Sequence, residues 1–229
     1  MPHTYEFARA ALAVDCVVFG LARDGLKVLL IERAIEPFRG SWALPGGFVR
    51  VDETLDQAAE RELVEEAGVR VSYLEQLYTF GAVDRDPRER VVSVAYYALV
   101  NPAVHAPAAD TDAARAAWFS ANALPKLAFD HASIVLVATT RLRAKVRYRP
   151  IGFGLLPEAF TLTELQTVYE KILGRPLDKR NFRKKILSYG FVEPTDERQT
   201  RVAHRAAQLF RFDRSAYEKW AERGYMFEV

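Results

Sequence analysis

Three glutamates that lie close together in the sequence have the spacing of a chemical site. Glu62, Glu65 and Glu66 stand at i, i+3 and i+4, so on an α-helix their side chains share one face within a single turn. Like charges at these spacings destabilise an isolated helix by roughly 0.2–0.5 kcal/mol per pair. A divalent cation removes that repulsion, and Mg²⁺ is usually held by carboxylates together with substrate phosphates. The cluster therefore predicts a Mg²⁺ or Mn²⁺ site; the plainer alternative is a solvated acidic helix face.

The helix that must position these glutamates has an apolar side and a defined end. Gly68 is the expected left-handed stop at its C-terminus. Ahead of it lies a loop in which Gly46 and Gly47 let backbone carbonyls come close to a metal ion or a diphosphate. The apolar residues recur at helical spacing and give the helix a face to bury: Leu55, Ala58, Ala59, Leu63 and Ala67.

The whole stretch from Gly47 to Val69 resembles the Nudix box. That motif consists of a Gly, five residues, a Glu, seven residues and then Arg-Glu-U-x-Glu-Glu-x-Gly-U, where U is apolar. The resemblance implies that the three glutamates are catalytic metal ligands, that Arg61 braces a glutamate at the catalytic site, and that Glu53 supports the loop or adds to the metal site. Every fixed position is filled in this chain: Gly47, Glu53, Arg61, Glu62, Leu63, Glu65, Glu66, Gly68 and Val69.

The composition is that of an ordinary globular protein with room for one large or two small domains. Of 229 residues, 50% are hydrophobic and 27% are charged. No apolar run approaches the length of a membrane span, and the N-terminus lacks the layout of a signal peptide. We therefore expect a cytoplasmic protein. Cys16, the single cysteine, reads as a buried thiol, and the four histidines share no zinc-ligand spacing.

The first part of the chain mixes strands and helices, which predicts an α/β sandwich over residues 1–146. A turn at Ala22–Gly25 suits a hairpin. Asp130 is the expected N-cap of a helix over His131–Lys145. Strands are expected over Ala11–Phe19, Lys27–Glu32, Val69–Ser72, Gln76–Phe80 and Val91–Val100.

An arginine-rich loop over residues 84–90 allows two interpretations. It is either a solvated hairpin tip or a site where Arg85 and Arg88 bind a diphosphate with bidentate forks. Trp42 either stacks on an adenine or packs in the core. The candidate ligand-binding residues are therefore Arg85, Arg88, Trp42, Gly46 and Gly47.

A break at Arg147–Pro157, with two prolines and two glycines, interrupts any regular element. It predicts a boundary between a domain over residues 1–149 and a second over residues 150–229. The second domain holds the basic charge, because residues 171–205 carry ten Lys and Arg but only four Asp and Glu. Such an asymmetry indicates a nucleic-acid partner.

The second domain begins with the order helix, short turn, basic helix, which is typical of a helix-turn-helix. Thr161 or Thr163 caps the first helix, and Asp178 caps the second, Lys179–Ser188, which ends at Gly190. Phe191–Phe212 then predicts a β-hairpin wing, and Ser215–Arg223 predicts a closing helix.

The basic helix has an apolar side and a base-reading side. Phe182 and Ile186 must face the first helix, so Arg180, Asn181 and Lys184 point outward. Arginine and lysine read guanine in the major groove, and asparagine reads adenine. The alternative is a merely solvated basic face. The predicted DNA-binding residues of helix and wing are Lys179, Arg180, Asn181, Arg183, Lys184, Arg198 and Arg201.

A Nudix domain followed by a winged helix resembles the Nudix-related transcriptional regulators of NAD metabolism, the NrtR family. Further segments resemble that family's sequences: Arg85–Arg88, Leu127–His131, Phe160–Leu162 and Leu177–Phe182. The resemblance implies a homodimer that represses genes of NAD synthesis or salvage at a palindromic site on double-stranded DNA and is released by ADP-ribose. The intact box keeps a second function open, a Mg²⁺-dependent ADP-ribose pyrophosphatase. The outward basic helix favours the repressor.

Overall fold

The computed structural model describes residues 6–71, 73–101, 113–200, 206–223 and 227–229. The chain divides into two compact units, Met1–Thr140 and Arg141–Val229, and the division falls inside helix α2 (His131–Lys145). The boundary predicted at residues 149 and 150 lies beyond the end of that helix, and it stays a prediction. The helix α2 and its bounds are as predicted from the sequence.

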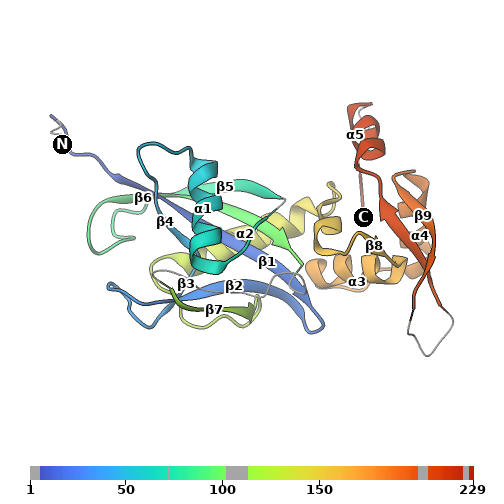
Figure 1. Ribbon diagram of the computed structural model, residues 1–229, viewed down its shortest axis with the longest axis horizontal. Coiled ribbons are helices and arrows are strands. Elements are labelled where there is room, and N and C mark those ends of the chain that lie inside the picture. The colour runs from blue at the N-terminus through green and yellow to red at the C-terminus, as the bar shows by residue number, and fades with distance from the viewer. Residues whose placement is uncertain (1–5, 72, 102–112, 201–205, 224–226) are drawn as a thin grey trace. The chain divides into compact units, whose positions relative to one another are not determined.

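The first unit is built on a mixed seven-stranded sheet with helices on its two faces (Figure 1). The main strand order is β3-β2-β1-β6-β5, with β4 paired to β1 and β7 paired to β2. Strands β1 and β6 are parallel over ten residue pairs, Ala11↔Val91 to Gly20↔Val100. The strands are β1 (Ala11–Ala22), β2 (Gly25–Arg33), β3 (Trp42–Ala43), β4 (Gly46–Phe48), β5 (Leu74–Phe80), β6 (Val91–Val100) and β7 (Ala113–Ser120).

Alternation along β1 assigns neighbouring side chains to the two faces of the sheet. Val14, Cys16 and Val18 belong to the core cluster that includes Leu63 and the alanines of helix α1 (Leu55–Ala67). Asp15 lies between them in sequence, and its carboxylate meets His131 of α2. Each face of the central strand is therefore covered by one helix, which confirms the predicted α/β/α sandwich.

Helix α1 begins and ends where its sequence dictates. The Thr54 hydroxyl accepts a hydrogen bond from the Gln57 backbone N–H, and the Gln57 side chain accepts one from the Thr54 N–H, which completes a capping box. Gly68 at φ 65° ends the helix in the left-handed conformation. The predicted stop is confirmed.

One predicted element is wrong, and the structure contains elements that the sequence did not predict. Val69–Val71 form no strand, because the chain that leaves α1 reaches the sheet only at β5; the predicted end of that strand, residue 72, lies outside the described residues. Strand β7 was not predicted because alanine has low strand propensity, yet Leu29 pairs with Trp118 there. The break after α2 contains a 3₁₀ helix, Ile151–Leu155, where no regular element was expected.

The second unit has the order of a winged helix. A three-stranded sheet with order β8-β10-β9 lies in it, and β9 and β10 form the predicted antiparallel wing. Thr161, not Thr163, is the N-cap of α3. The elements are β8 (Ala159–Phe160), α3 (Leu162–Leu173), α4 (Lys179–Ser188), β9 (Val192–Arg198), β10 (Gln208–Phe212) and α5 (Arg214–Glu222). Among the described residues, no helix is long and apolar enough to cross a membrane.

Candidate functional site

Arg61 is the centre of an ion-pair network on helix α1. Its Nε and Nη2 donate to the two oxygens of Glu53 at 2.9 and 2.6 Å, and its Nη1 donates to Glu62 Oε1 at 2.6 Å and to Glu65 Oε2 at 3.1 Å. Its Nη2 also donates to the Phe48 carbonyl at 3.2 Å. One guanidinium therefore joins α1 to β4 and to the loop between them, as a bracing residue should.

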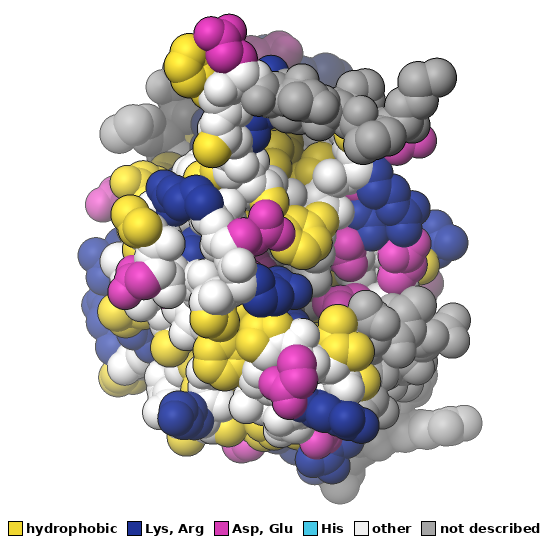
Figure 2. Space-filling model, turned by 90° about the vertical axis from the view of Figure 1, so that its left-hand side faces the viewer, with side chains coloured by type: hydrophobic (Ala, Val, Ile, Leu, Met, Phe, Trp, Pro, Cys, Tyr) yellow, Lys and Arg dark blue, Asp and Glu magenta, His cyan; other side chains and the backbone are white. Residues whose placement is uncertain are grey.

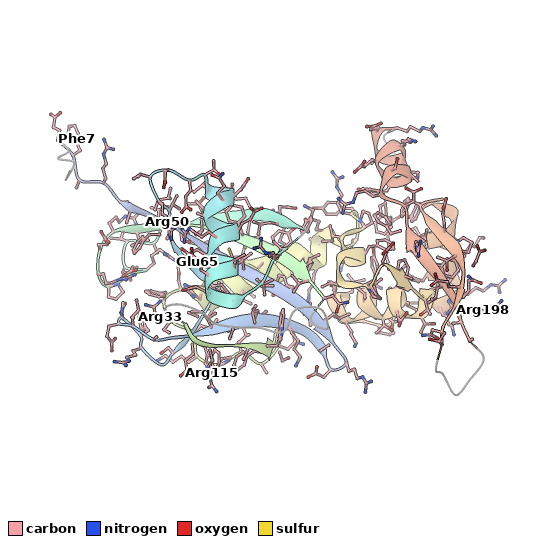
Figure 3. All side chains as sticks on the ribbon, viewed as in Figure 1. Phe7, Arg33, Arg50, Glu65, Arg115 and Arg198 are labelled. Carbon is pink, nitrogen blue, oxygen red and sulfur yellow. The ribbon has the colours of Figure 1, made fainter. Side chains whose placement is uncertain are left out.

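The pKa values of the partners follow from this network. Hydrogen bonds from Arg61 and from the Arg50 N–H lower the pKa of Glu53 to about 2. Burial raises the pKa of Glu62 above its ordinary value, although Arg61 acts in the opposite direction. Glu65 is more exposed, at 37% of its side chain, and lies beside Arg50 (Figure 3).

Gly46 and Gly47 are required by close contacts with the chain itself. A Cβ on Gly46 would lie 2.2 Å from the Val14 carbonyl oxygen, and a Cβ on Gly47 would lie 2.3 Å from Glu62 Oε1. The Gly46 N–H also donates to Glu66 Oε2 at 2.8 Å. The glycines thus let strand β4 approach β1 and two of the glutamates, a different reason from the approach to a metal ion or diphosphate that the sequence predicts.

The donor chemistry of the three glutamates suits a hard divalent cation, and Nudix hydrolases generally use one. Glu62 and Glu66 are buried carboxyl groups, which a cation would neutralise. Arg61 instead binds Glu62 and Glu65, while Gly46 binds Glu66. Within the part of the chain that the structure describes, no three acidic, cysteine or histidine side chains are gathered closely enough to hold a metal ion. The metal site therefore stays a prediction, and a cation would have to share these carboxylates with Arg61.

A pocket of about 450 Å³, partly open to solvent, lies beside this site in the first unit. Gly46, Gly47, Arg85 and Arg88 line it, so four of the five predicted ligand residues come together here. Its wall combines cationic groups, which suit phosphates, with aromatic rings, which suit a planar ring, and it also contains the acidic Asp15 and Asp86. Its remaining lining residues are Ala13, Asp15, Ile31, Arg33, Leu44, Phe48, Asp86, Val91, Phe129 and His131.

Both predicted arginine forks are engaged by carboxylates. Arg85 is buried and donates to Asp15 and Asp130. Arg88 forms a bidentate pair with Asp86 at 3.0 and 2.8 Å. The loop therefore contributes Arg85, Asp86 and Arg88 to the pocket wall, whereas Asp84 and residues 87–90 are exposed, and the binding of a diphosphate by its arginines stays a prediction.

Two arginines and two aromatic rings of the pocket wall contact one another. The guanidinium carbons of Arg33 and Arg88 lie 4.9 and 5.9 Å from the centroid of the Phe129 ring, and Arg88 also lies 5.4 Å from the Phe48 ring. Figure 3 shows Arg33 among the loops at this end of the unit, and in Figure 2 hydrophobic and basic side chains are intermixed on the face that this end presents. Such contacts keep the guanidiniums oriented.

Asp15 forms the polar floor of the pocket. It accepts hydrogen bonds from Arg85 Nη2 at 2.9 Å and Ser93 Oγ at 2.5 Å, and its other oxygen lies 3.2 Å from His131 Nε2. Burial alone would raise the pKa of Asp15, but His131, Arg85 and Ser93 together lower it well below its ordinary value. His131 Nδ1 accepts from the Leu44 N–H at 2.9 Å, which fixes the proton on Nε2.

Sequence reasoning missed Asp15, Arg33, Phe129 and His131 as pocket residues. One signal was present: Asp15 is a lone charge in an apolar strand, and buried charges are paired. Trp42 was predicted as a ligand residue but does not line this pocket. Its ring packs edge-on against Phe119 at 4.5 Å, with Arg115 4.9 Å from its centroid. This contact favours the packing alternative for Trp42.

Helix α4 presents the predicted base-reading residues to solvent. Phe182 and Ile186 are buried, as predicted, whereas Lys179, Arg180, Asn181 and Lys184 are exposed. Arg183 differs, because its Nη2 donates to Thr163 Oγ1 of α3 at 2.8 Å. Arg183 therefore ties the two helices together within this unit. The DNA contacts of these side chains remain predictions.

Of the predicted DNA contacts in the wing, Arg198 lies within the described residues. Arg198 ends β9, is exposed, and donates from Nη1 to the Ala206 carbonyl at 3.4 Å (Figure 3). The other predicted wing contact, Arg201, lies outside the described residues, as does Arg205.

Two family models match the chain in the order of its two units. The NUDIX domain model matches residues 10–137, and the NrtR DNA-binding winged helix domain model matches residues 152–212. The chain belongs to the NrtR family. Its relative in Acinetobacter baylyi, named ADPR responsive transcriptional repressor NtrR, is 38% identical over 218 residues, which cover 93% of this chain and 86% of the relative.

Two solved NrtR structures from Shewanella oneidensis are similar to this chain. The one complexed with a 27mer DNA has a TM-score of 0.80 and 35% identity, and the match covers 94% of this chain and 97% of that one. The isolated NUDIX domain complexed with ADP ribose has a TM-score of 0.56 and 39% identity over 59% of this chain and 90% of that one. Within this family, both kinds of ligand thus occur on chains of the same fold.

Proposed function

We propose that this protein is a transcriptional repressor of NAD synthesis or salvage genes that leaves its operator when ADP-ribose binds the Nudix pocket. The observation that carries the proposal is α4, on which Arg180, Asn181 and Lys184 are exposed while Phe182 and Ile186 are buried against the rest of the unit. An enzyme that acts on a small nucleotide has no need of such a helix. The family, with a repressor and a DNA complex among its members, supports it.

Two observations support ADP-ribose as the ligand: the side chains that line the pocket, and the ligand of a related NUDIX domain. Arg33 and Arg88 beside Phe48 and Phe129 provide cationic groups for a diphosphate next to aromatic faces for a base. The related NUDIX domain of Shewanella oneidensis binds ADP ribose. The protein acts in the cytoplasm, where operator DNA and nucleotides are both available.

The protein reads its operator as a homodimer. One winged helix makes too few base contacts for a specific site, so two copies read a palindrome whose half-sites are separated by about one helical turn, roughly 10 base pairs. Analytical ultracentrifugation of the protein with an operator duplex tests this. A single copy per duplex at saturation contradicts the dimer.

A binding assay on the promoter adjacent to its own gene tests the repressor function. The labelled duplex should shift at nanomolar protein in physiological salt, and ADP-ribose should release it, whereas AMP at the same concentration should not. A scrambled duplex of equal length is the control for non-specific binding. Binding that ADP-ribose leaves unchanged contradicts the proposal.

The intact acidic cluster supports a second candidate function, hydrolysis of the ADP-ribose diphosphate bond by water. Mg²⁺ or Mn²⁺ held by Glu62, Glu65 and Glu66 would polarise the phosphate and lower the pKa of water. Glu65→Gln with Glu66→Gln should abolish any release of AMP and leave ligand-free DNA binding intact. The matched control is Glu60→Gln, an exposed glutamate on the same helix outside the cluster. If the double variant stays folded but loses DNA binding, this division of roles is wrong.

A further inference from the structure

Arg85 lines the ligand pocket and is also bonded to Asp130, the residue that precedes helix α2. Its Nε donates to Asp130 Oδ2 at 3.1 Å and its Nη2 to Asp130 Oδ1 at 2.8 Å, a bidentate pair. The Asp130 carbonyl accepts hydrogen bonds from the Ser133 and Ile134 N–H groups at 2.9 and 3.3 Å. Asp130 therefore sets the position of the first turn of α2, and Arg85 sets the position of Asp130.

The residue before Asp130 has a strained backbone and its ring lines the pocket. Phe129 has φ 51°, a conformation that non-glycine residues adopt only when their surroundings impose it. The surroundings are the Arg33 guanidinium 4.9 Å from the ring and the Phe38 ring at 4.8 Å, edge to face. Phe129 thus places a pocket-lining ring and a strained backbone one residue before Asp130.

The other end of α2 is bonded to the helix-turn-helix. Arg143, in the last turn of α2, donates from Nε to the carbonyl of Ile172 in the last turn of α3 at 3.1 Å. Helix α3 in turn holds α4 through Arg183 and Thr163. Helix α2 thus has the pocket-lining His131 at its first residue and Arg143, which is bonded to α3, in its last turn.

We propose that Arg85 is a positioning residue that transmits ligand binding to α2 through Asp130. A bound diphosphate competes with the Asp130 carboxylate for the Arg85 guanidinium, and the released Asp130 lets the first turn of α2 move. This inference rests on the proposed function and specifies its regulation. Ligand and operator then bias one element in opposite directions, so each weakens the other by the same factor.

Asp130→Asn in the full chain tests the inference, because it weakens the pair with Arg85 and Asp130 itself does not line the pocket. ADP-ribose binding is measured by calorimetry on free and operator-bound protein, with a chelator present so that no hydrolysis occurs. Wild-type protein should show a coupling factor within the usual range of about 5- to 150-fold. In Asp130→Asn the free protein should bind ADP-ribose more tightly, because the carboxylate no longer competes for Arg85, and the coupling factor should fall toward one.

A variant of the neighbouring acidic residue is the matched control. Asp86→Asn breaks the pair with Arg88 in the same loop but leaves Arg85 and Asp130 bonded. It should change the affinity for ADP-ribose and keep the wild-type coupling factor. Hydrogen exchange gives a second readout: ADP-ribose should alter the protection of amides over residues 131–137 in wild-type protein and in Asp86→Asn, but not in Asp130→Asn.

The outcomes distinguish a failure of the proposed repressor function from a failure of the role assigned to Arg85. If wild-type protein couples the two ligands and Asp130→Asn couples them equally, Arg85 does not transmit the signal, although the repressor function stands. If wild-type protein shows no coupling, the proposed function is wrong and the inference falls with it. If Asp130→Asn does not fold, Asp130→Glu, which keeps the carboxylate but moves it, should reduce the coupling factor partway, and an unreduced factor overturns the inference.

Discussion

The two units hold their functional charges in opposite ways. In the first unit, Arg61 and Arg85 are each bonded to two or more carboxylates, Asp15 is bonded to Arg85, Ser93 and His131, and all three are largely buried. In the second, the charged Arg180 and Lys184 of α4 are exposed, as is the polar Asn181. Buried charges must be satisfied within the fold, because an unpaired one costs several kcal/mol. Exposed charges remain solvated until DNA phosphates and bases arrive.

Because of this difference, mutations in the two units should have different effects, on stability in the first unit and on DNA binding in the second. A change in the first unit's network should destabilise the fold, whereas a change on α4 should alter only binding. A single unfolding transition that responded equally to both kinds of variant would contradict this expectation.

Among these variants, Asp15→Asn should lower the free energy of unfolding the most. The amide brings an N–H group against donors of Arg85, Ser93 and His131, and loss of one partner of a buried ion pair costs about 3–5 kcal/mol. Urea unfolding monitored by tryptophan fluorescence measures the free energy of unfolding. The control is Lys184→Ala on exposed α4, which should change it by less than about 0.5 kcal/mol.

Gly47→Ala should lower the free energy of unfolding by less than Asp15→Asn does, and it should disturb the acidic cluster around Glu62. The added Cβ would lie 2.3 Å from Glu62 Oε1, so the carboxylate must move away from Arg61. Overpacking of this kind costs about 1–3 kcal/mol. Gly25→Ala gives a contrast, because its Cβ meets nothing within 4 Å and only its φ of 130° is strained. If Gly47→Ala leaves both stability and ADP-ribose hydrolysis unchanged, this contact has no role.

Arg180→Ala should affect binding and leave stability alone. Loss of one base contact in the major groove costs about 1–3 kcal/mol against the preferred site and relaxes the preference at one base position. Fluorescence anisotropy with the operator and its single-base variants measures both. Arg183→Ala is the informative comparison, because Arg183 contacts Thr163 and should reduce stability more than base preference.

The folded state should also lose a stabilising ion pair in acid. The pKa of Glu53 is lowered to about 2 in the folded protein from an ordinary value of 4.5. The Glu53 pair with Arg61 therefore stabilises the fold fully above about pH 4.5 and loses this effect as the pH falls toward 2. Wild-type protein and Glu53→Gln should differ in free energy of unfolding by a constant amount from pH 6 to 8, and the difference should shrink below pH 4.5. A difference that grows in acid would contradict the assigned partner.

The sequence predicted the local features and missed those that depend on distant contacts. Helix α1 and its Gly68 stop, α2 and the Asp178 cap of α4 follow from short-range patterns, and all are present. Strand β7 forms only because β2 pairs with it, although alanines dominate its sequence. The roles of Asp15 and Asp130 as partners of Arg85 join segments separated by 70 and 45 residues, so no local pattern indicates them.

Arg198→Ala in the wing should have the smallest effect of these variants, a modest loss of DNA affinity. Arg198 is exposed at the end of β9 and donates a 3.4 Å hydrogen bond to the Ala206 carbonyl, so its removal should not unfold the unit. As a phosphate contact it should weaken binding by the same amount on operator and scrambled DNA, and the slope of log K against log salt should fall by about one. Titrations from 50 to about 200 mM salt measure that slope. Arg180→Ala provides the contrast, because it should change the ratio between the two duplexes. An Arg198→Ala variant that lost base preference while its salt slope stayed unchanged would mean that the wing reads bases, and the assignment of specificity to α4 alone would have to be given up.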